Sequence, residues 1–406
     1  MNMDTSPLTG DPTTARGERR RRSHLELRRE LVARAAANRT DLAAGPVEVD
    51  PRIYVDPARF ELERRAFQHV PILACLSGDL PEPGSKLLFD ALGPELLLVR
   101  GRDGRVRAFR NACPHRGARV VTECDTRARM TCRFHGWSFD LEGRLVGLPG
   151  AEGFEGIDRA ARGLSEVAVA EWCGMVFVRV APGGPIDVAA HLGSFADELA
   201  ELELERARPM KHTRLETESN WKYAWDTYCE SYHFGSLHAR TVAPRVMSNV
   251  MLLQPFGRHA RTGMPRRDWA ALAGRPESEW PPVDYGGNYF IYPNINLNVS
   301  CGPNGEMFYG FYHLYPGARV GQTVTRMMTY RPGHTDPKFP DSDWTQLHDF
   351  IETVVRTEDY AVAEEGQRNL AQLPPGHRML FGANEGLLQQ WHRDWEATLA
   401  EVAGTR

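Results

Sequence analysis

Two short stretches of this chain each place a cysteine and a histidine a few positions apart. The first reads C-P-H-R-G and contains Cys113 and His115, and the second reads C-R-F-H-G-W and contains Cys132 and His135. Thiolates and imidazoles are soft and borderline ligands for transition metals. The spacing therefore predicts a four-ligand metal site that two loops of the fold must bring together.

Two cysteines and two histidines suit either tetrahedral zinc or a mixed-ligand iron-sulfur centre. Zinc patterns usually keep the cysteines together and the histidines together, whereas each stretch here carries one of each. A Rieske [2Fe-2S] cluster needs two cysteines on one iron and two histidines on the other. The mixed order favours iron, and Gly117 and Gly136 allow backbone amides to approach the sulfides.

These stretches, with Asn111 before the first, resemble the cluster-binding motif of Rieske oxygenases. The respiratory form of the motif has an extra cysteine in each loop, and this chain has Ala118 and Phe134 at those places. The resemblance therefore points to the oxygenase or ferredoxin branch. A plain Rieske electron carrier and a zinc-stapled binding protein are the alternatives from other classes, and the length beyond the cluster region argues against the first.

A second candidate metal site lies in residues 220–238. On one continuous helix, Asp226, Glu230 and His233 would share a face, because they are spaced i, i+4 and i+7. His238 would rotate off that face unless the glycine between the two histidines breaks the helix. The two histidines are candidate metal ligands, and a pair of structural histidines is the alternative.

Two imidazoles and one carboxylate form the facial triad that holds non-haem Fe(II). The stretch resembles the catalytic motif of Rieske oxygenases, in which an acidic residue three before the first histidine bridges to the cluster of a neighbouring subunit. That resemblance assigns the bridge to Glu230, where many ring-hydroxylating members carry aspartate and some branches, including ones acting on quaternary amines, carry glutamate. Asp226 is the reserve candidate.

The third ligand is expected from a long helix predicted over residues 343–370. Glu358 and Asp359 fall on or beside its buried stripe, and a buried acid needs a partner. Resemblance to the family's E-D and downstream Q pattern selects Asp359, with Glu358 second. An exposed pair on the helix margin is the alternative.

Trp221, Trp225, Tyr228 and Tyr232 repeat at helical spacing within the same region. Such an aromatic stripe predicts a core face. A cage for a cationic substrate is the alternative.

The expected fold is α+β and has four segments. The resemblance implies that residues 68–180 are an all-β Rieske domain, which fits their short strands and the turns expected at Asp103-Gly104 and Glu142-Gly143. It also implies that residues 181–406 are a helix-grip (START-like) catalytic domain with an antiparallel sheet and a long C-terminal helix. The segments are a polar, partly disordered tail that runs into a helix (1–45), a helical segment packing on the catalytic domain (46–67), the Rieske [2Fe-2S] domain (68–180) and the catalytic mononuclear iron domain (181–406).

The resemblance implies a terminal oxygenase component with a Rieske [2Fe-2S] cluster and a mononuclear Fe(II). Such a protein takes electrons from a separate ferredoxin or NAD(P)H-dependent reductase and uses O2 to hydroxylate, dihydroxylate or oxidatively dealkylate a small organic substrate, expected here to be aromatic. A quaternary amine is the alternative substrate. A homotrimer is implied as well, and alternating strand positions in 289–299 and 308–313 are the candidate pocket lining.

Composition limits the partners and the compartment. The net charge of -4 gives no case for nucleic acid or an anionic membrane. No apolar run approaches the roughly 20 residues that span a bilayer. Seven cysteines without framework spacing fit a reducing compartment, so a cytoplasmic protein is expected.

Overall fold

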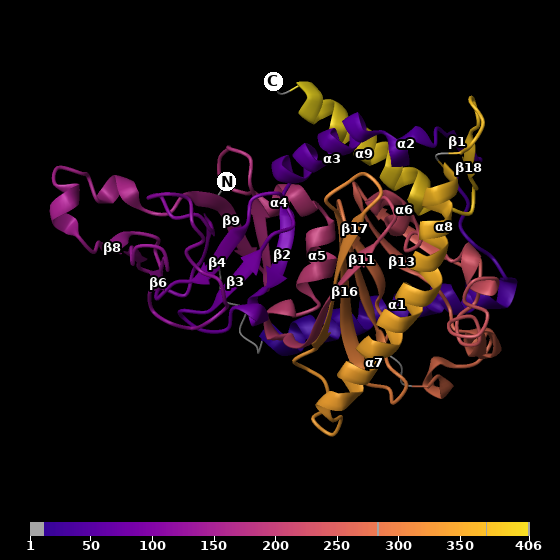
Figure 1. Ribbon diagram of the computed structural model, residues 1–406. Helices are drawn as coiled ribbons and strands as arrows, with labels where there is room; N and C mark the ends of the chain where they lie inside the picture. Colours follow the sequence, from indigo (N-terminus) through magenta and orange to yellow (C-terminus); the bar gives the residue numbers. More distant parts are fainter. Residues whose placement is uncertain (1–11, 282–283, 371, 405–406) are drawn as a thin grey trace. The chain divides into compact units, whose positions relative to one another are not determined.

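The computed structural model describes residues 12–281, 284–370 and 372–404, which form two compact units (Figure 1). Among these residues no helix has the length and apolar character that crossing a membrane requires. Each unit gathers separate stretches of the chain. Unit 1 contains the chain up to Val55, Leu192–Gly317 and Gly321–Trp395, and unit 2 contains Asp56–His191, Ala318–Val320 and the chain from Glu396 on.

Unit 2 is built around a six-stranded antiparallel sheet and a three-stranded one, as the all-β prediction for this region requires. The larger sheet has the order β2 (Ile72–Leu76), β10 (Met175–Arg179), β9 (Glu166–Trp172), β5 (Val106–Arg110), β4 (Leu96–Arg100) and β3 (Lys86–Phe89). The smaller sheet consists of β6 (Met130–Thr131), β7 (Ser138–Phe139) and β8 (Leu145–Gly147). Gly104 and Gly143 adopt positive φ in the turns that the sequence predicts.

Unit 1 is built around a seven-stranded antiparallel sheet with helices on both faces. Figure 1 shows α7 (Asp341–Val354) and α8 (Tyr360–Leu370) crossing one face, which we call the inner face. His348 of α7 hydrogen-bonds to Thr329 at 2.9 Å and so identifies the strand residues on that face. The order is β11 (Arg208–Thr217), β17 (Thr323–Arg331), β16 (Met307–Pro316), β15 (Ile295–Cys301), β14 (Gly287–Ile291), β13 (His259–Gly263) and β12 (Leu252–Phe256).

The segment predicted as a partly disordered tail differs from the structure. Residues 1–11 lie outside the described part, but α1 (Pro12–Ala37) is a long helix of unit 1. Leu27 and Leu31 are buried, as the predicted helix requires, against a cluster that includes Trp269. The arginine-rich stretch is ordered because acidic residues of unit 1 neutralise it. For example, Arg20 pairs with Glu203 at 2.8 Å, and both side chains are only 3% exposed.

The predicted helical segment 46–67 is divided between the two units. In unit 1, β1 (Val47–Val49) pairs with β18 (Met379–Phe381) and is followed by α2 (Arg52–Val55). In unit 2, α3 (Pro57–His69) is capped by Asp56, whose carboxylate accepts hydrogen bonds from the first turn. The segment predicted as one helical block is therefore divided after Val55. The remaining helices are α4 (Val188–Leu192), α5 (Phe195–Ala200), α6 (Trp221–Asp226) and α9 (Gly386–Gly404).

Candidate metal centres

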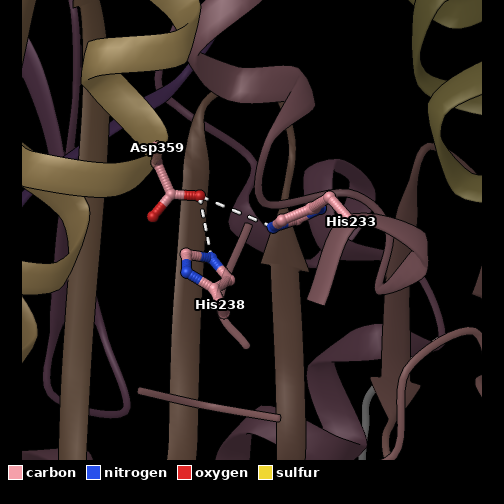
Figure 2. A group of neighbouring side chains, drawn as sticks. All are labelled: His233, His238 and Asp359. Carbon is pink, nitrogen blue, oxygen red and sulfur yellow. Dashed lines mark ion pairs between the residues drawn. The ribbon is translucent and has the colours of Figure 1, made fainter. Parts of the chain in front are cut away.

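Three predicted residues of unit 1 converge on one point. The Asp359 Oδ1 atom lies 3.5 Å from His233 Nε2 and 3.2 Å from His238 Nε2, as Figure 2 shows. The ligand atoms of the three side chains all lie within 4.8 Å of one another. His233 Nε2 is buried and has no hydrogen-bond partner among the described residues. A buried nitrogen of this kind, facing a second imidazole and a carboxylate, fits a metal ion of the facial-triad type.

Two further carboxylates, besides that of Asp359, orient the two imidazoles. Glu230 hydrogen-bonds to His233 Nδ1, and Glu358 hydrogen-bonds to His238 Nδ1. Thr241 donates a further hydrogen bond of 2.8 Å to Glu358. Contacts of this type fix the ring orientation of metal-binding histidines and make the other nitrogen a better ligand.

The surplus of negative charge around the two rings favours a cation at this point. Burial by itself would lower the pKa of His233, but the nearby carboxylates of Asp359 and Glu230 outweigh burial and raise the pKa to about 9. The pKa of His238 is also raised, because Asp359 and Glu358 outweigh the effect of burial. A bound metal ion would replace the proton as the positive charge between the ligands.

The predicted single helix through residues 220–234 is wrong, because α6 ends at Asp226. The Glu230 carboxylate accepts hydrogen bonds from the backbone N–H groups of Tyr232 and His233, and thereby offers them an alternative to the helical ladder. A short 3₁₀ helix, η5 (Tyr232–Gly235), and a following turn then bring His238 beside His233, with ring centroids 4.9 Å apart. The histidines therefore meet across a turn.

The predicted long helix is present, and a π-helical turn interrupts it at the metal group. This turn, η8 (Val355–Asp359), joins α7 to α8. It places Glu358 at Nδ1 of His238 and Asp359 at Nε2 of the same ring. Glu358 and Asp359, which the sequence left as alternatives for the third metal ligand, therefore contact different nitrogens of His238.

Asp226, the reserve candidate, does not join this group. Its carboxylate accepts hydrogen bonds from the Tyr54 hydroxyl and from His392 Nε2, the latter at 2.8 Å. The shared helix face that would have placed Asp226 beside Glu230 does not exist, since α6 ends there. No local pattern links Asp226 to His392, which lies far along the chain on α9.

The aromatic stripe is part of the core only where α6 continues. Trp221 and Trp225 are buried, whereas Tyr232 is 61% exposed because it follows the end of the helix. Tyr228 lies between, with its hydroxyl 3.2 Å from the hydroxyl of Tyr360.

The two Cys-His loops of unit 2 share one backbone geometry. Gly117 N donates to Cys113 O at 2.8 Å, and Gly136 N donates to Cys132 O at 2.9 Å. Both glycines have positive φ, at 74° and 72°, a conformation that glycine adopts without strain. Two matching turns of this kind can hold the two sides of one cofactor.

The donor groups of these loops are arranged as a mixed-ligand cluster requires. Cys113 and Cys132 are 4% and 1% exposed, whereas the His135 ring lies at the surface, 4.7 Å from the ring of His115. Burial raises the pKa of the Cys113 thiol, and the backbone N–H of His115 lowers it. An amide that points at the sulfur and imidazoles near solvent are what the Rieske prediction expects.

Comparison with known proteins matches both units. The family "Ring hydroxylating alpha subunit (catalytic domain)" matches residues 204–401, and the family "Rieske [2Fe-2S] domain" matches residues 70–162. The glycine betaine monooxygenase oxygenase subunit of Chromohalobacter salexigens is 32% identical over 187 residues, which are 46% of this chain and 42% of that protein. The biphenyl dioxygenase α subunit of Metapseudomonas furukawaii is 31% identical over 206 residues, covering 47% and 44%. The chain thus spans about half the length of the curated relatives it matches.

Solved structures share the fold over most of the chain. The quaternary ammonium Rieske monooxygenase CntA superimposes with a TM-score of 0.74 at 22% identity, covering 91% of this chain and 98% of CntA. Naphthalene 1,2-dioxygenase superimposes with a TM-score of 0.66 at 17% identity, covering 87% and 92%. The predicted combination of a β-rich cluster domain and an α+β catalytic domain is confirmed.

Proposed function

Because this chain belongs to the family of Rieske non-haem iron oxygenases, as a ring-hydroxylating α subunit, we propose that it is the terminal oxygenase component of an electron-transfer system. It receives electrons from a separate ferredoxin or NAD(P)H-dependent reductase and uses O2 to oxidise a small organic molecule. The reaction is a hydroxylation, a dihydroxylation or an oxidative dealkylation. The observation that carries the proposal is the convergence of His233, His238 and Asp359 in a chain that also has two Cys-His loops.

The cofactors of this family are a Rieske [2Fe-2S] cluster and a mononuclear iron. We propose that Cys113 and Cys132 bind one iron of the cluster and that His115 and His135 bind the other. His233, His238 and Asp359 bind the mononuclear iron through Nε2, Nε2 and a carboxylate oxygen. When bound, these groups supply electron transfer and dioxygen activation.

The chain's own side chains prepare the mononuclear site for that chemistry. Glu230 and Glu358 hold the Nδ1 protons of the two imidazoles and so keep each ring turned with Nε2 toward the site. Thr241 holds Glu358 in turn. This chain of contacts fixes the two histidine ligand atoms before a metal or a substrate arrives.

We infer a cyclic homotrimer in which the cluster of the neighbouring subunit approaches Glu230, and Glu230 bridges that cluster to the mononuclear iron. Its side chain is 11% exposed and contacts His233, so it lies between a metal ligand and the surface of unit 1. The structure of a quaternary ammonium Rieske monooxygenase gives insights into inter-subunit electron transfer, which supports the same arrangement here. No disulfide joins the cysteines of the described residues, which supports a cytoplasmic location.

An aromatic compound is our first proposal for the substrate, and a quaternary amine is the second. The biphenyl dioxygenase relative supports the first, and the glycine betaine and carnitine monooxygenase relatives support the second. Glutamate at position 230 also fits the branches that act on quaternary amines.

The test is metal analysis followed by oxygen uptake. Anaerobically purified protein is expected to be red-brown, to hold one further iron besides the cluster, and to consume O2 only with a reductase, NAD(P)H and a substrate. Biphenyl, glycine betaine and carnitine form the first panel. Colourless protein that holds zinc contradicts the proposal. Protein that passes electrons but consumes no O2 with any substrate is an electron carrier instead.

A further inference from the structure

A row of small and polar residues crosses the inner face of the sheet in unit 1. Thr262 of β13 pairs with Asn288 of β14, which pairs with Asn298 of β15. Asn298 pairs with Gly310 of β16, which pairs with Thr329 of β17. Directly paired residues of antiparallel strands point to the same face. Since Thr329 contacts His348 of α7, the whole row, which we call the polar row, belongs to the inner face.

Part of this polar row has no partner in the protein. Thr262 Oγ1 and Asn298 Oδ1 are buried and make no hydrogen bond to any described residue. The amide of Asn298 is oriented, because its Nδ2 donates to Asn288 Oδ1 at 2.6 Å. Buried polar atoms are nearly always hydrogen-bonded, so two exceptions in one row, on either side of Asn288, indicate a ligand or ordered water.

The next row along the strands is aromatic and lies beneath α6. Phe290, Asn296 and Tyr312 are paired across β14, β15 and β16. Trp225 of α6 contacts Phe290 edge-on at 5.6 Å between centroids, and Tyr228 lies 5.4 Å from Tyr312. Asn296 Oδ1 and Trp225 Nε1 are again buried without partners among the described residues.

The aromatic row lies on the side of the metal group. The Tyr228 hydroxyl is 3.2 Å from that of Tyr360, which directly follows Asp359 in the chain. Thr325, on the strand beyond Tyr312, hydrogen-bonds to Tyr360 as well. The polar row is two residues further along each strand, about 6.6 Å away, on the side of His348. When a small molecule is oxidised at the metal, the part near the reacting carbon therefore contacts the aromatic row. The opposite end of the molecule contacts the polar row.

Among the described residues, the inner face offers this far end no unpaired cation. Lys211 of β11, which pairs with Thr329, bonds to Asp349, and Arg208 and Arg331 both bond to Asp341. A carboxylate would meet the acceptor oxygen of Asn298 and no cation free of an acidic partner. An alkyl end would leave the buried polar atoms of Asn298 and Thr262 without a hydrogen bond. This costs free energy, because these atoms have also lost their hydration.

We propose that the polar row determines specificity by binding an uncharged hydrogen-bond donor, such as a hydroxyl or an amide N–H, at the end of the substrate remote from the oxidised carbon. Asn298 Oδ1 accepts from this group, and the Thr262 hydroxyl accepts or donates. The inference rests on the proposed function and narrows its substrate to an apolar or aromatic body with a neutral polar end.

Four molecules with one phenyl group and different ends test the inference. Toluene, benzyl alcohol, benzoate and benzyltrimethylammonium are titrated into anaerobic holoenzyme, and the dissociation constants are compared. Benzyl alcohol is expected to bind about tenfold or more tightly than toluene and than either ion, since a site built for a hydroxyl rejects analogues that lack it. Asn298→Leu and Thr262→Val are expected to bring the ratio of alcohol to toluene affinity close to one.

Thr323→Val is the matched control. Thr323 is a buried threonine of the same sheet, but its hydroxyl donates to Ser219 O at 2.6 Å. This variant should lower the melting temperature and leave the ratio unchanged, whereas Thr262→Val should leave the melting temperature unchanged or raise it. A wild-type ratio near one, tighter binding of an ion, binding by none of the four, or a ratio unaffected by both row variants overturns the inference.

The titration needs neither electrons nor O2, which separates the inference from the proposed function. Protein that prefers the alcohol but never consumes O2 contradicts the function alone. Protein that oxidises a substrate without discriminating the four ends contradicts the inference alone.

Discussion

Both imidazoles of the metal group use their two nitrogens for different purposes. Nδ1 of each ring contacts a glutamate, and Nε2 of each ring faces Asp359. His348 in the same unit contrasts with them, because both of its nitrogens are bound by threonines, at 2.8 and 2.9 Å. A histidine with one nitrogen left for a metal can thus be distinguished from a structural one by its contacts.

Asp359 and Glu358 should differ sharply in their effect on metal content. Asp359→Ala removes a ligand and is expected to empty the mononuclear site, whereas Glu358→Ala removes only the partner of His238 Nδ1 and should weaken iron binding about 10- to 100-fold. Iron per chain and the visible absorption of the cluster are measured together. Equal iron loss in both variants, or full retention in Asp359→Ala, would move the ligand role to Glu358.

Glu230→Gln tests the bridge between metal centres. We expect both metals to stay bound and the oxidation of the reduced cluster to slow by about 10- to 100-fold, because the hydrogen bond to His233 Nδ1 changes its charge and polarity. Stopped-flow absorption of the cluster under O2 measures this rate. Asp226→Asn is the control, since Asp226 contacts Tyr54 and His392 instead. Unchanged turnover in Glu230→Gln would remove the bridge role.

His313 on β16 makes unit 1 sensitive to acid. Burial lowers its pKa to about 3, and the charges of Arg326 and His212 act in the same direction. The unfolded chain, with an ordinary histidine pKa near 6.5, therefore binds the proton more readily. The stability that His313 contributes is complete above pH 6.5 and is lost as the pH falls toward 3, amounting to about 2 kcal/mol between pH 7 and pH 5.

His313→Leu should lose this pH dependence, as measured by urea unfolding at pH 7 and pH 5. The exposed His377→Gln serves as the control and should behave as the wild type. An equal loss of stability in His313→Leu and the wild type between the two pH values would contradict the assignment.

At the scale of elements, the π-helical turn η8 allows the carboxylates of two adjacent residues to contact the same imidazole ring, that of His238. In a regular α-helix, Glu358 and Asp359 would point about 100° apart around the axis. The wider turn brings them to Nδ1 and Nε2 of His238. Such turns are rare and often mark functional sites.

Deleting Thr357 should convert this turn to regular helix. The residue is exposed and its side chain contacts only the carbonyl of Thr353, so the deletion removes length with little loss of packing. We expect helix content to persist and mononuclear iron to bind about 10- to 100-fold more weakly. Thr357→Ala keeps the length and should bind iron as the wild type does. Unaltered iron binding after the deletion would mean that the π turn is dispensable.

Local patterns predict an element when its own residues determine it. The alternation of strands β14 to β16 is of this kind. The candidate metal ligands His233, His238 and Asp359, which motif resemblance singled out, also lie together. The end of α6 was not predictable, because it depends on which N–H groups the Glu230 carboxylate binds. The order of the arginine-rich first part of α1 was missed because its arginines meet acids far along the chain, such as Glu203.

At the scale of the whole molecule, the two metal centres belong to separate units. The cluster loops lie in unit 2, and the mononuclear group lies in unit 1. A variant that empties one centre should therefore leave the other intact.

Mixed oligomers test whether the centres cooperate between chains. His135→Ala, at an exposed cluster ligand, and Asp359→Ala should each be inactive alone. Co-expressed with different tags and purified through both, they should regain reductase-dependent O2 uptake, because a cluster of one chain then serves the mononuclear iron of another. Doubly tagged oligomers that hold both cofactors but stay inactive would place the transfer within a single chain.

The position of α1 in unit 1 has a consequence for synthesis. The helix leaves the ribosome long before its partners Trp269 and Leu272, which follow only after the main stretch of unit 2 has been made. At roughly 5–20 residues per second, that delay lasts about 10 to 50 s. During this time the nascent chain carries a basic helix whose Leu27 and Leu31 are exposed to solvent, while the cluster-binding unit can already fold.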